Sequence, residues 1–193
     1  MSIAVIYSRA QDGINAPLVT VEVHLSRGLP SFSIVGLPET TVKESKERVR
    51  SAILNNQFEF PLSRITINLA PADLPKEGGR FDLPIAIGIL IASGQISAKD
   101  INNYEIIGEL SLTGELRAIS GVLPVALATS KTERSLILPI INADEAVLVE
   151  NIICKPAAHI LEVCAHFSGT TLIDAHNSQP VYMGVTYKLL LSP

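Results

Sequence analysis

Cysteine and positive charge are both scarce in this sequence. Its 193 residues include only two cysteines, Cys154 and Cys164, too few for the disulfide framework of a small secreted protein. The first residues also lack the basic stretch and apolar segment of a secretory signal. Both absences favour a cytoplasmic protein.

The charge balance excludes a protein that binds nucleic acid with its whole surface. The net charge is -4 and the isoelectric point is near 5.6, so DNA binding would need a local basic patch. Residues 83–92 are all apolar or glycine, but this run is shorter than the roughly 20 residues that cross a bilayer. We therefore expect a buried core helix there and no membrane partner.

Motifs that hold nucleotides or metals are also absent. The sequence has no G-x-x-x-x-G-K-[ST], G-x-G-x-x-G or G-x-S-x-G pattern. His159 and His166 match no compact zinc spacing with the two cysteines, which are more simply explained as small core residues. We expect no catalytic residue, cofactor or metal site in this chain.

The chain is organised around residues 69–94, which read as a strand end, a polar loop and the buried helix. Asp82 is suited to cap the helix N-terminus, and Pro84 fits its first turn. Gly94 is suited to end it. The loop holds Lys76 and Arg80 near free backbone N–H groups, an arrangement that attracts anions or acidic partners. The alternative is that both are solvated loop charges.

A second basic feature precedes this loop. Residues 41–56 predict a helix that starts with a capping box, and Lys43, Lys46 and Arg50 fall on one exposed stripe of it. A phosphate backbone or an acidic partner would relieve their mutual repulsion. The alternative is that Glu44 and Glu47 neutralise this face in place.

Strands and helices mix along the rest of the chain. Residues 19–25 and 64–69 alternate apolar and polar side chains, as strands with one buried face do. Residues 31–35 are expected to return as the partner strand of 19–25 after a turn. Helices are expected near 122–130, 142–149 and 156–167, with short strands at 136–138 and 152–154. This order predicts an α+β or mixed α/β fold, not a purely parallel sheet.

Two blocks are specific enough to suggest a family. Residues 30–52 contain P-S-F-S-I-V-G-L-P and V-K-E-S-K-E-R-V-R-S-A, and residues 68–84 read N-L-A-P-A-D-L-P-K-E-G-G-R-F-D-L-P. Together they closely resemble the N-terminal, ChlI-like domain of bacterial Mg-chelatase-like AAA+ ATPases of the ComM/YifB kind. The resemblance covers about residues 1–175 and implies the fold of ribosomal protein S5 domain 2, shared with the proteolytic domain of Lon.

The resemblance also implies partners. In the full-length family this domain precedes a hexamer-forming ATPase, which uses ATP and Mg and acts on branched DNA during natural transformation. The expected partners are therefore the chain's own ATPase module, further copies of itself, and DNA. Residues 176–193 depart from the family and are expected to be a tail or a truncated linker.

The likeness to Lon permits a chemical test. Lon has a Pro-Lys-Asp-Gly-Pro-Ser motif whose serine attacks the peptide, and residues 75–80 align with it, so Arg80 takes the place of the nucleophile. Leu123 takes the place of the catalytic lysine in the second match. Arginine cannot attack and leucine cannot accept a proton, so the Ser-Lys dyad is absent. Ser111 or Ser120 would have to occupy new positions to replace it.

The leading hypothesis is a non-enzymatic domain that assists ring assembly and DNA handling in an ATP-driven branch-migration machine. Lys43, Lys46 and Arg50 would contact phosphates, and the Lys76/Arg80 loop would contact DNA or a neighbouring subunit. Fold analogy alone favours an ATP-dependent protease instead, although fold does not fix function. A purely structural oligomerisation module is the third alternative.

Overall fold

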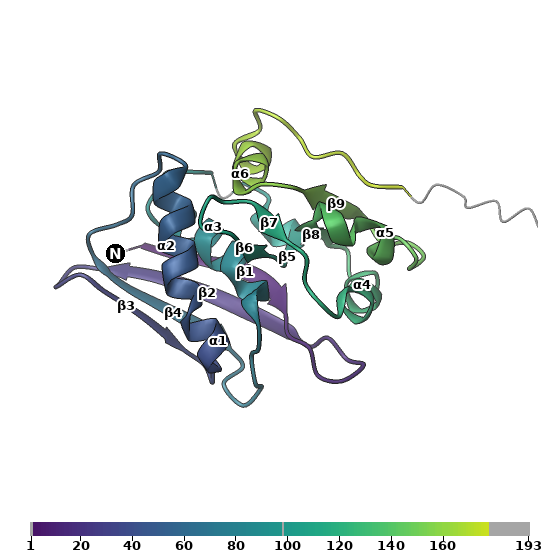
Figure 1. Cartoon of the computed structure of the whole chain (residues 1–193), viewed down its shortest axis with the longest axis horizontal. Helices are drawn as coiled ribbons and strands as arrows, with labels where there is room; N and C mark the ends of the chain where they lie inside the picture. The colour runs from purple at the N-terminus through teal and green to yellow at the C-terminus, as the bar shows by residue number, and fades with distance from the viewer. Residues whose placement is uncertain (1, 98, 178–193) are drawn as a thin grey trace, which may run out of the picture.

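A computed structural model describes residues 2–97 and 99–177. Its centre is a seven-stranded sheet with the order β3-β4-β2-β1-β5-β8-β9 (Figure 1). The strands are β1 (Ser2–Arg9), β2 (Leu18–Ser26), β3 (Ser31–Val35), β4 (Arg64–Ala70), β5 (Tyr104–Ile106), β8 (Ser135–Pro139) and β9 (Cys154–Ala157). A separate two-stranded hairpin is formed by β6 (Glu109–Leu110) and β7 (Leu116–Arg117).

The sheet mixes both pairing directions. β1 and β4 lie antiparallel to β2, whereas β3 pairs with β4, β1 with β5, β5 with β8 and β8 with β9 in parallel. The predicted mixture of strands and helices without a purely parallel sheet is therefore confirmed. β2 alternates buried and half-buried residues throughout, as its sequence pattern predicts.

The expected pairing of residues 31–35 with residues 19–25 is wrong. β4 lies between β3 and β2, and β3 runs parallel to β4. Both edges of β2 are already occupied, by β1 over eight residue pairs and by β4 over seven. The helical segment between β3 and β4 supplies the long crossover that a parallel pair requires.

Helices cover both faces of the sheet. One core cluster contains side chains of α1 (Thr40–Lys43), α2 (Ser45–Asn55), α3 (Asp82–Ala92) and α6 (Ile160–Ser168). A second, on the other face of β8, contains side chains of α4 (Val122–Thr129) and α5 (Ala143–Ala146). Figure 1 shows α2 and α3 lying across the β1–β4 part of the sheet. Short 3₁₀ turns are η1 (Gly79–Phe81), η2 (Ile101–Asn103) and η3 (Ile140–Asn142).

α3 is the core helix that the sequence predicts. Ten of its eleven residues are buried. Gly88 lets it approach the sheet closely, because a Cβ at this position would lie 2.5 Å from Cγ2 of Val23 in β2. The helix ends at Ala92 with Ser93 as its C-cap, and Gly94 follows with a φ of 75°, as the prediction of a left-handed terminus requires.

Asp82 does not cap α3, which corrects the prediction. Phe81 of η1 occupies the cap position, and the Asp82 carboxylate is fully buried. Its oxygens accept hydrogen bonds from Nε and Nη2 of Arg48, at 2.6 and 3.1 Å, and from the backbone N–H of Leu110 at 3.2 Å. Burial raises the pKa of Asp82, and these hydrogen bonds oppose that rise.

The capping box at Thr41 and Glu44 is also absent. The helix is interrupted at Glu44, which separates α1 from α2, and neither helix has a side-chain cap. The Thr41 hydroxyl instead accepts a hydrogen bond from the backbone N–H of Gly78 at 3.1 Å. The predicted core face is confirmed, since Val42, Val49, Ala52 and Ile53 are all fully buried.

The second half of the chain follows the expected order with shifted boundaries. α5 ends at Ala146, three residues before the expected end, and α6 begins at Ile160. Asn142 occupies the N-cap position of α5 but makes no capping hydrogen bond, because its side chain donates to and accepts from the backbone of Ile119, at 2.9 and 3.0 Å. The proposed tail, residues 176–193, lies outside the described residues from position 178 onward. Within the described part of the chain, no helix is long and apolar enough to cross a membrane.

The buried Arg48–Asp82 pair predicts a large loss of stability when only one partner is removed. Arg48→Met leaves a buried carboxylate unpaired, which should lower the free energy of unfolding by about 3 kcal/mol at pH 7. The deficit should shrink toward pH 5, because without the guanidinium the pKa of Asp82 rises further and protonation removes the buried charge. Urea unfolding at both pH values measures this.

Adding Asp82→Asn is the matched control. The double variant removes the charge together with its partner, so it should recover more than half of the loss caused by Arg48→Met alone. Additive losses would contradict a direct coupling between the two side chains.

Candidate functional site

The loop after β4 encloses Lys76, which the sequence placed at a binding surface. The side chain is fully buried, and Nζ donates a hydrogen bond to the backbone carbonyl of Pro71 within the same loop. The Lys76 carbonyl accepts from the backbone N–H of Glu39 at 3.1 Å, which ties the loop to the segment before α1. Burial lowers the pKa of Lys76, partly offset by Asp73.

Arg80 links three segments that are distant in the sequence by hydrogen bonds. It lies in η1 and is 6% exposed, and its Nη2 donates to Oε1 of Gln11 at 2.9 Å and to the carbonyl of Ser120 at 3.0 Å. Its Nη1 is buried and makes no hydrogen bond within the described residues. Burial lowers the pKa of Arg80, and Glu77 opposes this. Gly121 permits this packing, because a Cβ there would lie 2.5 Å from Oε1 of Gln11.

The alternative that Lys76 and Arg80 are solvated loop charges is wrong, because both side chains are buried. Both bind protein groups inside the fold instead. Contact of this loop with DNA or a neighbouring subunit stays a prediction. Sequence reasoning missed Gln11 as a partner because it lies 69 residues from Arg80, and no local pattern marks such a contact.

The two positions aligned with the Lon dyad lie close together in the structure. Arg80 binds the carbonyl of Ser120, which precedes Leu123 by three residues. Leu123 is the second residue of α4, where its backbone N–H donates to Oε1 of Glu145 at 3.2 Å, and its side chain is partly exposed. The two positions that the sequence aligns with a Ser–Lys dyad are therefore linked through the segment from Ser120 to Leu123.

Neither candidate serine replaces the missing nucleophile. The Ser111 hydroxyl is buried, lies 2.8 Å from the Thr113 hydroxyl and accepts from the backbone N–H of Glu115 at 3.0 Å. Ser120 is exposed, and its contact to the loop is made by its carbonyl oxygen. Among the described residues, no lysine, histidine or carboxylate forms a hydrogen bond with either hydroxyl, so neither Ser111 nor Ser120 is paired with a base.

The predicted basic stripe lies at the surface. Lys43, at the end of α1, and Lys46 and Arg50, on α2, are all exposed. The Arg50 guanidinium carbon lies 4.9 Å from the centre of the Phe60 ring, which holds the side chain against the loop before β4. None of the three forms a salt bridge within the described residues. Glu44 and Glu47 therefore do not neutralise the stripe by direct pairing.

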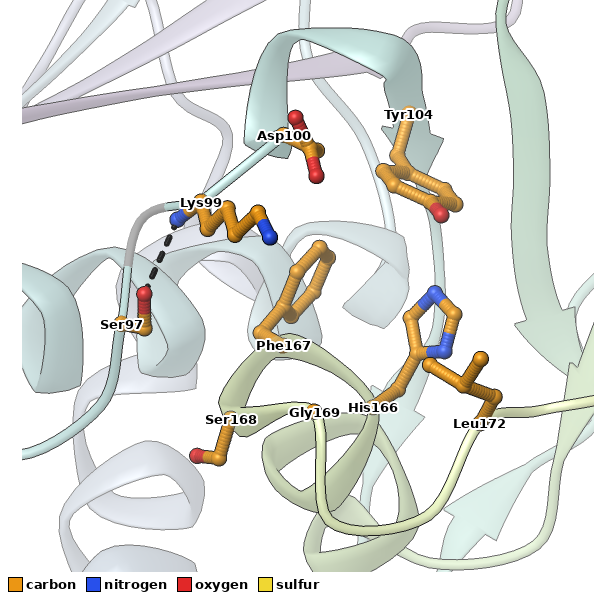
Figure 2. Close-up of a pocket in the computed structure, with 9 residues that line it drawn as sticks. All are labelled: Ser97, Lys99, Asp100, Tyr104, His166, Phe167, Ser168, Gly169 and Leu172. Carbon is orange, nitrogen blue, oxygen red and sulfur yellow. Dashed lines mark hydrogen bonds between the residues drawn. The ribbon is translucent and has the colours of Figure 1, made fainter.

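An aromatic pocket of about 220 Å³ lies beside α6 (Figure 2). Tyr104, His166 and Phe167 pack edge to face on one another, with ring centres 5.1 to 5.4 Å apart. Burial and then Lys155 lower the pKa of His166, whose Nδ1 accepts from the backbone N–H of Ile173. The His166 ring therefore packs against the pocket wall, and the hydroxyls of Ser97 and Ser168 and the Lys99 side chain lie at the pocket's edge (Figure 2).

The residues considered for a metal site have structural roles. Cys154 and Cys164 are buried in the core, and burial raises the pKa of each thiol to about 12. His159 caps α6, because its Nδ1 accepts from the backbone N–H of Leu161 at 3.2 Å. No cluster of three or more metal-ligating side chains occurs in the part of the chain that the structure describes.

The fold is a mixed α/β domain in which the loop after β4 buries Lys76 and Arg80 against backbone and side-chain groups of the protein. Residues 21–142 match the protein family described as subunit ChlI of Mg-chelatase. The chain therefore belongs to the ChlI family of Mg-chelatase subunits.

Longer bacterial relatives are similar to most of the chain. It is 57% identical over 169 residues to the competence protein ComM of Haemophilus influenzae, covering 88% of this chain and 33% of ComM. It is 53% identical over 174 residues to the uncharacterized protein YifB of Escherichia coli, covering 90% of this chain and 34% of YifB. An uncharacterized protein of Mycobacterium bovis is 33% identical over 172 residues. The chain spans about a third of the length of these relatives.

The burial of Lys76 predicts that its charge plays no part in binding DNA. Lys76→Met removes a buried cation without changing the exposed surface, so affinity for a DNA duplex at low salt should stay within twofold of the unchanged protein. Fluorescence anisotropy with a labelled duplex measures this. Lys46→Met, which removes an exposed cation, is the matched control, and a larger loss for Lys76→Met than for Lys46→Met would contradict the structure.

Proposed function

We propose that the chain is the non-catalytic N-terminal domain of a Mg-chelatase-like AAA+ ATPase of the ComM/YifB type. In this proposal it adopts the fold of ribosomal protein S5 domain 2, as the Lon proteolytic domain does, and assists ring assembly and DNA handling during ATP-driven branch migration in competence. The observation that carries the proposal is Arg80, whose guanidinium binds Gln11 and Ser120 at the position aligned with a nucleophile.

The chemistry at this position supports a scaffold without peptidase activity. Peptide cleavage by a Ser-Lys dyad needs a hydroxyl that attacks and an amine that takes its proton. Arg80 offers only donors, and Leu123 has no group that titrates. The loop that would present a nucleophile instead joins the β1–β2 turn to the start of α4.

ATP and Mg belong, in this proposal, to the part of the full-length family outside the matched region. The chain has no glycine-rich phosphate cradle with its lysine, so its residues do not fit a bound nucleotide. The relatives are about three times as long as the match, which leaves room for an ATPase module. We expect a homo-oligomer, a hexamer in the full-length family, working in the cytoplasm.

The exposed stripe supports a role in handling DNA. The protein is acidic overall, so phosphate can be attracted only by a local concentration of positive charge. Lys43, Lys46 and Arg50 supply one on α1 and α2 with no carboxylate in direct contact within the described residues. Such contacts give affinity without sequence preference, as suits a motor that moves along DNA.

Reversing the stripe should weaken DNA binding in a salt-dependent manner. Lys43→Glu, Lys46→Glu and Arg50→Glu together should lower the affinity at 50 mM salt at least tenfold. They should also reduce the slope of log affinity against log salt by about 3, one unit for each lost phosphate contact. Anisotropy titrations over a salt series measure both quantities.

The control carries the same change in charge at other exposed positions. Arg27→Glu, Lys99→Glu and Lys131→Glu together alter the net charge equally but leave the stripe intact. Equal losses in the two triple variants would show that only net charge matters. If the unchanged domain has no measurable DNA affinity at low salt, and the stripe variant leaves branch migration by the full-length protein unchanged, the DNA-handling part is wrong.

The protease alternative predicts that the full-length protein cleaves an unfolded protein substrate, whereas the proposed function predicts that it does not. Incubation of the full-length protein with an unfolded protein and ATP should yield no cleavage products on a denaturing gel, because neither Ser111 nor Ser120 is hydrogen-bonded to a base. Cleavage abolished by a single change, Ser111→Ala or Ser120→Ala, would overturn the assignment. Light scattering of the domain with and without an oligonucleotide separates DNA handling from a purely structural oligomerisation role.

A further inference from the structure

The surface beside α4 carries an unusual amount of exposed aliphatic side chain. Five large residues there are 39% to 73% exposed, and we call them the α4–η3 face: Leu123, Leu127, Ile140, Ile141 and Leu148. The only polar side chain of α4, Thr129, is buried and donates to Oε2 of Glu105 at 2.6 Å. The solvent side of α4 therefore consists of leucine, proline and alanine alone, whereas a surface helix normally has a polar side.

Hydrogen bonds bring the elements that carry these residues together. Glu145 of α5 accepts from the backbone N–H of Leu123 at the start of α4. Asn142 of η3 binds both backbone groups of Ile119, just before α4, which brings Ile140 and Ile141 to the same end of the helix. Figure 1 shows α4 and α5 next to each other at one end of the sheet. Contiguous apolar surface of this kind marks a binding site more often than solvated surface.

The charges at the rim indicate the chemistry of the partner. Residues 140–154 include Asp144, Glu145 and Glu150, all exposed, and no lysine or arginine. α4 itself has no charged residue. An apolar centre with an acidic rim is complemented by a surface of aliphatic side chains flanked by lysine or arginine.

We infer that the α4–η3 face docks the domain onto the ATPase module of the full-length protein, through an apolar surface with a basic rim. The inference rests on the proposed function. The relatives carry about two thirds of their length outside the matched region, so most of the polypeptide is available as a covalently joined partner. Covalent linkage raises the effective concentration, so a modest apolar face is enough to keep the two modules together.

Leu123 belongs to the α4–η3 face and is also the position that the sequence aligns with a lysine. At the position that the resemblance to Lon aligns with a catalytic lysine, this chain has a hydrocarbon side chain that is 39% exposed and adds to the apolar surface of α4.

Amide hydrogen exchange tests the inference without disturbing the fold. A chimera in which this chain replaces the matching third of Haemophilus influenzae ComM is compared with the chain alone. Residues 122–129 and 140–148 should exchange at least tenfold more slowly in the chimera, while α2 exchanges equally in both. Leu127→Lys in the chimera should restore the faster exchange. Leu62→Lys, at an 87% exposed leucine in the loop before β4, should not.

Three results would overturn the inference. The first is equal exchange of α4 in the chimera and in the chain alone. The second is slow exchange in the chain alone that depends on its concentration and is lost in Leu127→Lys, because the face would then be covered by a second copy. The third is slow exchange in the chain alone that is lost when residues 178–193 are removed, because those residues would then be the occupant.

A second experiment applies if the chimera does not fold. The chain, added in trans to the remaining two thirds of ComM, should be retained in a pull-down and lost in Leu127→Lys but not in Leu62→Lys; no retention of the unchanged chain would overturn the inference. Leu127→Lys should leave the DNA affinity of the chain unchanged. Failure of the docking face and failure of the basic stripe are therefore distinguishable.

Discussion

The structure depends on one guanidinium that ties three elements around a buried carboxylate. Arg48 of α2 binds both oxygens of Asp82 at the start of α3, and it also donates to the carbonyl of Thr41 in α1. The remaining capacity of Asp82 is used by the backbone of Leu110 in β6. A charge buried this deeply is tolerated only when it is paired and hydrogen-bonded. The pair thereby fixes where α3 begins, and with it the loop that holds Arg80.

Arg80 is a second buried arginine, and it also binds acceptors from distant segments. An arginine that is 6% exposed must find acceptors, and it finds one in the β1–β2 turn and one before α4. Nη2 of the guanidinium has two acceptors, whereas Nη1 is buried with none among the described residues, which costs free energy. The side chain nevertheless joins segments from three parts of the chain around one turn.

Sequence patterns predicted the elements that arise from local periodicity. The alternation in β2, the all-apolar stretch of α3 and the core face of α2 each follow from side chains a few residues apart, so they could be read directly. Caps and charged partners were predicted poorly, because each competes with groups distant in sequence. Asp82 could have capped α3, but Arg48 lies 34 residues away and binds it more strongly. Thr41 could have capped its own helix, but its hydroxyl instead accepts a hydrogen bond from the backbone N–H of Gly78 in another loop. The order of β3, β4 and β2 was missed for the same reason, since β2 finds its second partner after the helical crossover.

The two surfaces proposed for binding lie on opposite sides of the sheet. The basic stripe belongs to α1 and α2, which pack with α3 over one face, whereas α4 and α5 enclose the second core cluster on the other. A domain with both ligands on one face would have to exchange DNA for its own ATPase module. With the faces separated by the sheet, α4 can remain docked through apolar contacts that do not respond to salt, while the stripe binds and releases phosphate through contacts that do. The division follows from composition: α4 has no charge to attract DNA, and the exposed side of α2 has too few apolar groups to bury.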